Sequence, residues 1–257
     1  MKVFFLGTNG WYPSNGNNTV CTVIVASDRL IALDAGDGFW KVPLLLNKFR
    51  KKRLDVFISH LHLDHIIGLH SLCKIERDCG ATNIRLIINS YYSSLLRKFL
   101  SHPFTLDPWS FKLSKVSLMG IQEGQSRLPY QVVSLPMVHA DPCWGFRIFI
   151  DDFTISYCTD TGRNNNLLAL SKNADLLITE CSLLPGSVTM PEWPHMSPEV
   201  AAQCAKDANA KQLVLTHFGA DVYLTLADRK KALSTAKKIF PSTICAIDGL
   251  ELDVKKS

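Results

Sequence analysis

The sequence has little that would set it apart from ordinary globular proteins. No apolar run approaches the roughly 18 residues that a membrane helix needs. The first ten residues lack the basic region and cleavage site of a signal peptide, so we expect no secretory leader and a cytoplasmic location. The excess of positive charge is also small, because 28 basic and 23 acidic residues leave a net charge of only +5 over 257 residues. This charge permits an anionic substrate without requiring one.

The cysteines also lack a pattern. No two of the eight are spaced as CxxC, and several lie in apolar runs. A disulfide scaffold is a poor interpretation for a chain of this length without a secretory leader. We therefore expect buried free thiols in a reducing compartment.

Short apolar runs and segments of helical spacing alternate along the whole chain. Strands are expected at residues 3–6, 20–26, 30–33, 54–59, 84–89, 131–138, 146–150, 154–158, 175–179 and 211–216. Helices are expected at residues 42–49, 66–77, 93–100, 197–208 and 226–240, turns and short strands within 102–130, and a closing hairpin at 244–254. This mixture predicts one α/β domain over residues 1–257, with two sheets covered by helices.

Four metal-binding side chains fall within six residues, directly after the expected strand 54–59. They are His60, His62, Asp64 and His65, in the spacing HxHxDH. Imidazole and carboxylate groups are the ligands of zinc sites that stay open to water. Four of them exceed what one catalytic zinc needs from a single loop, so two metals sharing the loop is the economical interpretation. A surface cluster of polar residues is the alternative, which the specific spacing disfavours.

Three further candidates also end expected strands: His139, Asp160 and His217. Each alone would more often be structural. Together they share their placement with the histidine loop, which favours a common role as ligands. His70 and His102 have no such placement and are taken as ordinary helix or loop residues.

With these motifs in place, the chain resembles the metallo-β-lactamase superfamily, and within it the ribonuclease Z-like branch. The resemblance rests on the histidine loop and on segments in the family's order, which include Gly7-Thr8-Asn9-Gly10, Leu33-Asp34-Ala35-Gly36-Asp37-Gly38, Asp160-Thr161, Thr216-His217-Phe218 and Ala246-Ile247-Asp248-Gly249. It implies an αββα four-layer sandwich. It also implies two Zn²⁺ ions per chain, with Mn²⁺ or Fe²⁺ as possible substitutes.

The same resemblance implies a ligand set. The first zinc would be held by His60, His62 and His139, and the second by Asp64, His65 and His217. Asp160 would bridge the two. Asp34 more naturally orients a ligand than binds metal.

His195 lies just before the helix expected from residue 198, where backbone N–H groups favour a phosphoryl oxygen. In the ribonuclease Z-like branch a histidine here is the proton donor, oriented by an acid that matches Glu180. A bridging hydroxide would attack phosphorus beside Asp64, and His195 would protonate the leaving oxygen. The alternative is that His195 only caps the helix and Glu180 is a surface acid.

Two departures from the family concern its RNA substrate. Transfer-RNA-processing members carry a long arm between the third and fourth motifs, but here only residues 140–159 separate His139 from Asp160. Asp221 stands where the family has a phosphate-binding cation. The chain is therefore an arm-less member.

Other features leave the substrate open. A basic run could contact phosphates or form a solvated helix end: Lys48, Arg50, Lys51, Lys52 and Arg53. Three tryptophans could stack on bases or aryl groups, or pack in the core: Trp109, Trp144 and Trp193.

The leading hypothesis is a dizinc phosphodiesterase acting on RNA 3′ ends or on small phosphodiesters. The second is a dizinc hydrolase of an aryl sulfate, a lactone or a β-lactam, and the third is a metal-binding protein without catalysis. Family analogy also implies a homodimer, and no membrane partner is expected.

Overall fold

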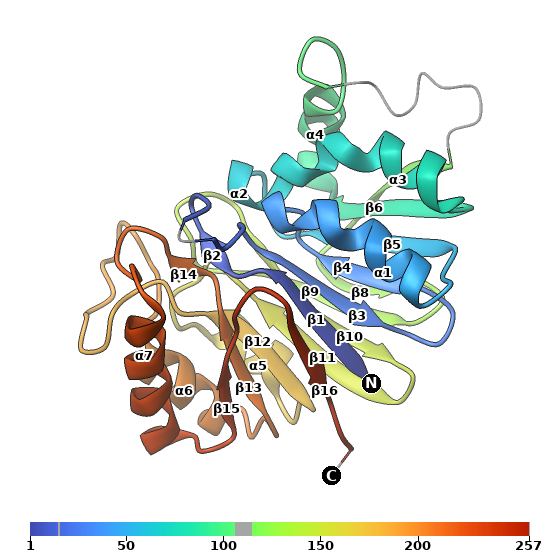
Figure 1. The fold of residues 1–257 in the computed structure, drawn as a ribbon. Coiled ribbons are helices and arrows are strands. Elements are labelled where there is room, and N and C mark those ends of the chain that lie inside the picture. Colours follow the sequence, from blue (N-terminus) through green and yellow to red (C-terminus); the bar gives the residue numbers. More distant parts are fainter. Residues whose placement is uncertain (15, 106–114, 257) are drawn as a thin grey trace.

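Two mixed β-sheets lie face to face in the computed structural model, which describes residues 1–14, 16–105 and 115–256 (Figure 1). Within these residues the first sheet has the order β16 (Leu250–Asp253), β1 (Lys2–Gly7), β3 (Cys21–Val25), β4 (Leu30–Leu33), β5 (Arg53–Ile58), β6 (Asn83–Asn89), β7 (Val116–Ile121). The second has the order β15 (Thr243–Cys245), β13 (Leu213–Thr216), β12 (Leu176–Glu180), β11 (Phe153–Cys158), β10 (Trp144–Ile150), β9 (Gln131–Pro136), β8 (Gly124–Arg127). A short parallel pair, β2 (Asn9–Gly10) and β14 (Phe218–Gly219), stands apart from both.

Helices cover the outer face of each sheet, so the expected αββα sandwich is confirmed (Figure 1). On the first sheet lie α1 (Val42–Lys48), α2 (Leu63–Ile66), α3 (Leu72–Cys79) and α4 (Ser93–Phe99), with the 3-10 turns η1 (Asp37–Lys41), η2 (Ile67–Ser71) and η3 (Ser90–Tyr92). On the second lie α5 (Asn165–Ser171), α6 (Pro198–Asp207) and α7 (Leu226–Ile239).

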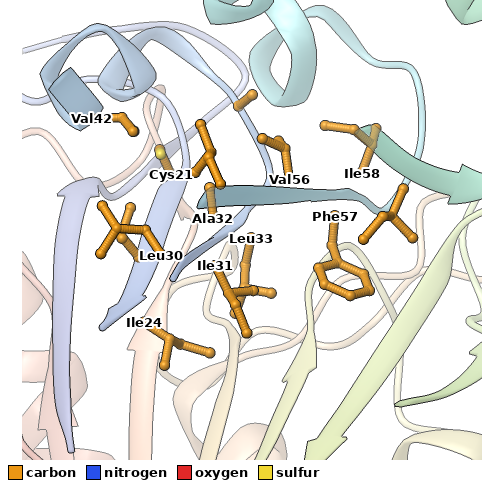
Figure 2. Packing of buried hydrophobic residues seen from close by; sticks show 14 of the residues in the cluster. Cys21, Ile24, Leu30, Ile31, Ala32, Leu33, Val42, Val56, Phe57 and Ile58 are labelled. Atoms are coloured by element: carbon orange, nitrogen blue, oxygen red, sulfur yellow. The ribbon is translucent and has the colours of Figure 1, made fainter. Parts of the chain in front are cut away.

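The central strands β4, β5 and β12 are buried on both faces, apart from the exposed first residue of β5, because the sheets are covered on both sides. All four residues of β4 are buried. Figure 2 shows Val56 and Phe57 of β5 on opposite sides of their strand, with Val42 of α1 on the side of Val56. The ring of Phe57 meets Phe146 of the second sheet at 5.2 Å between centroids. Full burial of such a side chain stabilises the fold by roughly 1.5–3 kcal/mol.

The strand directions gather several loops at one edge of the sandwich. Strands β4, β5 and β6 are mutually parallel in the first sheet, and β11, β12 and β13 in the second. Carboxyl ends of parallel strands meet at one edge of a sheet. The segments that follow β5, β11, β12 and β13 therefore converge, and these segments contain the residues singled out in the sequence.

The expected hairpin at 244–254 is wrong. The turn itself exists, because Gly249 has φ +88°, a conformation that favours glycine. However, β15 pairs parallel with β13 of the second sheet, while β16 pairs antiparallel with β1 of the first. The turn therefore carries the chain from one sheet to the other, and local patterning does not reveal the partner of a strand.

The remaining expected strands and helices lie within two residues of the observed ones, with one exception. The helix expected at 66–77 is divided, since η2 precedes α3. Helix α5 was not expected at all, although Asn164 caps it by accepting a 2.9 Å hydrogen bond from the Leu167 N–H. The described part of 102–130 holds the short strands β7 and β8, and Trp109 lies outside the described residues.

The eight cysteines form no disulfide among the described residues, and six of them are buried. Among the described residues, no helix combines the length and the apolar character needed to cross a bilayer.

Candidate metal centre

The histidine loop begins where β5 ends, and the fold brings the other candidates to it. His139 follows β9, Asp160 follows β11 and His217 follows β13. Their ligand atoms form two compact groups, each with all atoms within 4.8 Å of one another. One group consists of His60, His62, His139 and Asp160, and the other of Asp64, His65 and His217.

Asp160 stands between the two groups. Its Oδ2 lies 3.6 Å from Nε2 of His60 and 3.4 Å from Nε2 of His65, and its Oδ1 lies 2.9 Å from Nε2 of His217. One carboxylate therefore faces members of both groups. The family resemblance implies a bridging ligand at Asp160, and this role stays a prediction.

Local backbone geometry aims several of these side chains. Asp34, Asp160 and His217 have φ of 57°, 54° and 50°, in the left-handed region. Such a conformation costs a residue other than glycine about 1–2 kcal/mol, and its concentration at one site is typical of functional geometry. Next to them Gly10 is required, because a Cβ there would lie 2.3 Å from the His217 ring.

The histidine rings are fixed by hydrogen bonds on the side away from the centre. These bonds pair Nδ1 of His65 with Asp34 Oδ2 at 2.7 Å, Nε2 of His62 with Asp141 Oδ2 at 2.8 Å, Nδ1 of His217 with Ser182 Oγ at 3.1 Å, and Nδ1 of His60 with Ser59 Oγ at 3.0 Å. Partners of this kind orient metal-binding imidazoles and select their tautomer. Asp34 contacts His65, and its role in orienting a metal ligand stays a prediction. Asp141 and Ser182 were missed, and Asp141 could have been suspected as an acid two residues after His139.

The centre is chemically suited to divalent cations. Nε2 of His60 is buried and has no hydrogen-bond partner among the described residues, which is unusual for a polar atom unless it binds something else. Burial works against charge on Asp160, yet His217 and His65 hold its pKa well below the usual value. Conversely, burial opposes protonation of His217, but Asp160 raises its pKa to about 10. In the absence of metal, protons thus balance the buried carboxylates, and metal ions would displace them.

His195 and Glu180 form a second arrangement beside the centre. Nδ1 of His195 lies 2.8 Å from Oε1 of Glu180, which also accepts a 2.6 Å hydrogen bond from the Thr161 N–H. Glu180 is buried, and the N-cap of α6 is Ser197, so the alternative of a surface acid and a helix-capping histidine does not describe this geometry. Burial lowers the pKa of His195, but the charge of Glu180 outweighs it, so the pKa is raised.

A cleft of about 830 Å³ opens onto both arrangements. Its walls include Gly10, Trp11, Tyr12, His62, Leu63, Asp64, His139, Asp160, Ser182, Leu183, Met190, Trp193, His195, His217, Gly219, Asp221 and Val222. Trp193 is thus at the cleft, and Trp144 is buried. His70 and His102 take no part in either ligand group.

The basic run is remote from the cleft and engaged elsewhere. It precedes or begins β5, whereas the histidine loop follows that strand, so the strand's length of about 20 Å separates them. Lys52 donates to the Cys79 carbonyl at 2.8 Å, Arg53 pairs with Asp28 at 2.8 Å, and Lys48 lies 3.3 Å from Glu251.

Comparison with known proteins places this site in a family. A family model described as "Beta-lactamase superfamily domain" matches residues 29–218. Ribonuclease Z of Acaryochloris marina is 26% identical over 313 aligned positions, which cover all of this chain and 98% of the relative. The probable metallo-hydrolase YhfI of Bacillus subtilis is 25% identical over 223 positions, with 85% of this chain and 87% of the relative covered.

Solved structures show the same fold. The YhfI structure superposes with a TM-score of 0.78 at 22% identity, covering 98% of each chain. The short form of human tRNase Z superposes with a TM-score of 0.72 at 23% identity, covering 100% of each chain. Fold and site thus define a class, the metal-dependent hydrolases. The chain belongs to the metallo-β-lactamase superfamily, in its ribonuclease Z-like branch.

Proposed function

We propose that this protein is a dizinc phosphodiesterase whose general acid is His195. The observation that carries the proposal is the buried His195–Glu180 pair, which opens onto the same cleft as the two ligand groups. Two metal ions alone suit the hydrolysis of many esters and amides. A fixed proton donor beside them suits a phosphodiester, whose leaving alkoxide needs a proton.

The metal ligands would divide as the resemblance implies. One ion would be held by His60, His62 and His139 and the other by Asp64, His65 and His217, a division that the two compact groups support. Asp160 would hold both ions, which the distances from its carboxylate to His60, His65 and His217 support. When bound, such a pair of ions polarises a phosphoryl oxygen and lowers the pKa of water. The Trp11 N–H donates to Asp64 Oδ2 at 2.7 Å and holds that carboxylate in place.

His195 would act through the ring nitrogen that Glu180 leaves free. Because Nδ1 is engaged by the carboxylate, Nε2 is the nitrogen left for a substrate in the cleft. The raised pKa keeps the ring protonated to a higher pH than an ordinary histidine. Glu180 is itself fixed by the Thr161 and Met196 N–H groups, so the ring cannot swing freely.

The size of the chain favours small or single-stranded substrates over folded RNA. The ribonuclease Z alignment runs over 313 positions although this chain has 257 residues, so that relative carries segments absent here. Residues 140–159 are largely used by β10 and β11, which supports the absence of an arm there. The basic run offers no substitute near the cleft.

The test is a panel of substrates offered to the zinc-loaded protein under one set of conditions. It comprises bis-p-nitrophenyl phosphate, an aryl sulfate, a lactone, a β-lactam and a precursor transfer RNA. We expect the highest kcat/KM on the phosphodiester and weak, unspecific cleavage of the precursor. A higher kcat/KM on the sulfate, lactone or β-lactam would replace this proposal with the second hypothesis. Absence of any turnover by protein with full metal content would favour binding without catalysis.

A single domain over residues 1–257, a homodimer and a cytoplasmic location stay predictions from the sequence.

A further inference from the structure

We propose that Asp221 makes the cleft selective for phosphodiesters that carry a single phosphate, by repelling substrates with a second phosphate group. The inference rests on the proposed phosphodiesterase function and concerns the substrate class of that same site. It assigns to Asp221 the role of a specificity-determining residue.

The charges that line the cleft support this role. Among the described lining residues there is no lysine or arginine, while three are carboxylates: Asp64, Asp160 and Asp221. Asp64 and Asp160 belong to the ligand groups, where metal ions would offset their charge. Asp221 belongs to neither group, and no ion pair joins it to a described residue. No ion pair therefore neutralises its negative charge.

The position of Asp221 is fixed relative to the centre. It follows β14 and lies four residues after His217. The parallel pairing of β14 with β2 places Gly219 beside Gly10, the residue against which the His217 ring packs. Asp221 Oδ1 lies 3.1 Å from the point where a Cβ of Gly219 would be. The side chain is exposed, so it faces solvent at the mouth of the cleft.

The rest of the outer lining includes aromatic side chains and, among the described residues, supplies no lysine or arginine beside this carboxylate. Trp11 and Tyr12 form one aromatic pair, with ring centroids 5.3 Å apart, and Trp193 packs 5.3 Å from the His195 ring. Trp11 and Trp193 are 69% and 50% exposed. Such surfaces accept flat, uncharged groups of a substrate. A second phosphate outside the metal centre, by contrast, would meet the Asp221 carboxylate and no lysine or arginine of the described lining.

The expected size of the effect follows from Coulomb's law. A phosphate and a carboxylate several ångströms apart at a partly exposed site repel enough to change relative rates about 3- to 30-fold, and added salt reduces the effect.

The experiment compares two substrates that differ by one phosphate. Thymidine 5′-(p-nitrophenyl phosphate) and its 3′-phosphorylated counterpart have the same leaving group. We expect the zinc-loaded protein to prefer the first, and Asp221→Asn to narrow the ratio of kcat/KM by about 3- to 30-fold. Asp152→Asn is the matched control, because it removes one charge from the 81% exposed side chain in the β10–β11 turn. It should leave the ratio unchanged.

Binding is measured in parallel, so that the two ideas can fail separately. Thymidine 5′-phosphate and thymidine 3′,5′-bisphosphate are titrated into the same three zinc-loaded proteins by calorimetry. Discrimination in binding that Asp221→Asn relieves, without turnover of either ester, would uphold the charge effect and overturn the proposed function. Turnover with the same substrate ratio in wild type and Asp221→Asn would uphold the function and overturn the inference.

Discussion

At the scale of single residues, the centre is organised by groups that do not themselves enter it. Asp34 receives hydrogen bonds from the Ser59 hydroxyl and the Tyr157 hydroxyl, both at 2.8 Å, as well as from His65. A buried carboxylate with three such partners cannot rotate without leaving one of them unsatisfied. The position of the His65 ring is therefore set from the core rather than from the cleft.

His195 gives the most direct residue-scale prediction. Replacing it with alanine should leave the metal content unchanged, because His195 lies in neither ligand group. Turnover of an ester with a poor leaving group should fall by about 10²–10⁴, the usual contribution of a positioned acid. The loss should shrink for bis-p-nitrophenyl phosphate, since nitrophenolate leaves without a proton.

The control for this prediction is His70→Ala. His70 is exposed on η2 and bonds only the carbonyl of Ile67 among the described residues. It should affect neither metal content nor rate. Equal losses in His195→Ala for good and poor leaving groups would show that His195 binds or supports rather than donates a proton.

The residues of the centre differ in how visible they are in the sequence. Four of them can be recognised from the HxHxDH spacing, because they belong to a single loop: His60, His62, Asp64 and His65. Ser182 cannot, since it contacts His217 from 35 positions away. Its role depends on the pairing of β12 with β13, which only the folded sheet supplies.

At the scale of elements, the pair β2–β14 links the beginning of the chain to the last ligand. Phe218 lies opposite Asn9, and Gly219 lies opposite Gly10. This pairing brings the His217 ring against Gly10 and the Trp11 N–H against Asp64. The pairing of residues 9–10 with residues 218–219 thus positions two members of one ligand group, His217 and Asp64.

We predict that Gly10→Ala weakens that ligand group selectively. The added Cβ would lie 2.3 Å from Cε1 of His217, so either the ring or the strand pair must move. Metal affinity at this site should fall about 10- to 100-fold, as for the loss of an outer partner of a metal ligand. Competition with a metal chelator of known affinity would measure the metal affinity of the wild type and of Gly10→Ala.

A double-mutant cycle tests whether the ring is the cause. In the background of His217→Ala the space beside Gly10 is open, so Gly10→Ala should add little to the loss. Fully additive effects would mean that the glycine acts through the backbone and not through the His217 ring.

Elements also show where sequence patterns stop being informative. The run 30–33 and the helix from residue 226 are specified locally, the first by its apolar residues and the second by the capping box of Thr225 and Asp228. Strand β16 is equally regular, with alternating burial, but its partner β1 lies at the other end of the chain. Nothing near residue 250 encodes that choice.

At the scale of the whole molecule, Asp248 joins three distant segments. Its carboxylate accepts hydrogen bonds from the Thr8 hydroxyl at 2.8 Å and from the Asn18 N–H at 2.8 Å, and it lies 3.3 Å from Nζ of Lys41. The loop that supplies Gly10 and Trp11 to the cleft is therefore tied to the turn between β15 and β16.

Asp248→Ala should accordingly lower the global stability. Truncation leaves the buried Thr8 hydroxyl and the half-buried Asn18 N–H without this partner, so the free energy of unfolding should fall by about 1–3 kcal/mol. Asp253→Ala is the comparison, because the Asp253 side chain is 63% exposed and, among the described residues, forms an ion pair with Lys2 alone. Its effect should stay within about 1 kcal/mol. Urea unfolding followed by circular dichroism measures both losses of stability. Equal losses in the two variants would show that Asp248 contributes no more to stability than a surface carboxylate.

The pairing of β1 with β16 has a further consequence, which concerns the nascent chain. Lys2 lies opposite Asp253, so this pairing closes nearly the longest loop that the sequence allows. Contacts of such sequence separation form late and slow the folding reaction. Until residues 250–253 emerge from the ribosome, the apolar strand β1 is an open sheet edge that another chain could extend. Once β16 has paired with β1, β16 is the edge strand of the sheet, and its Glu251 and Asp253 side chains point to solvent. The last strand thus shields the first from aggregation.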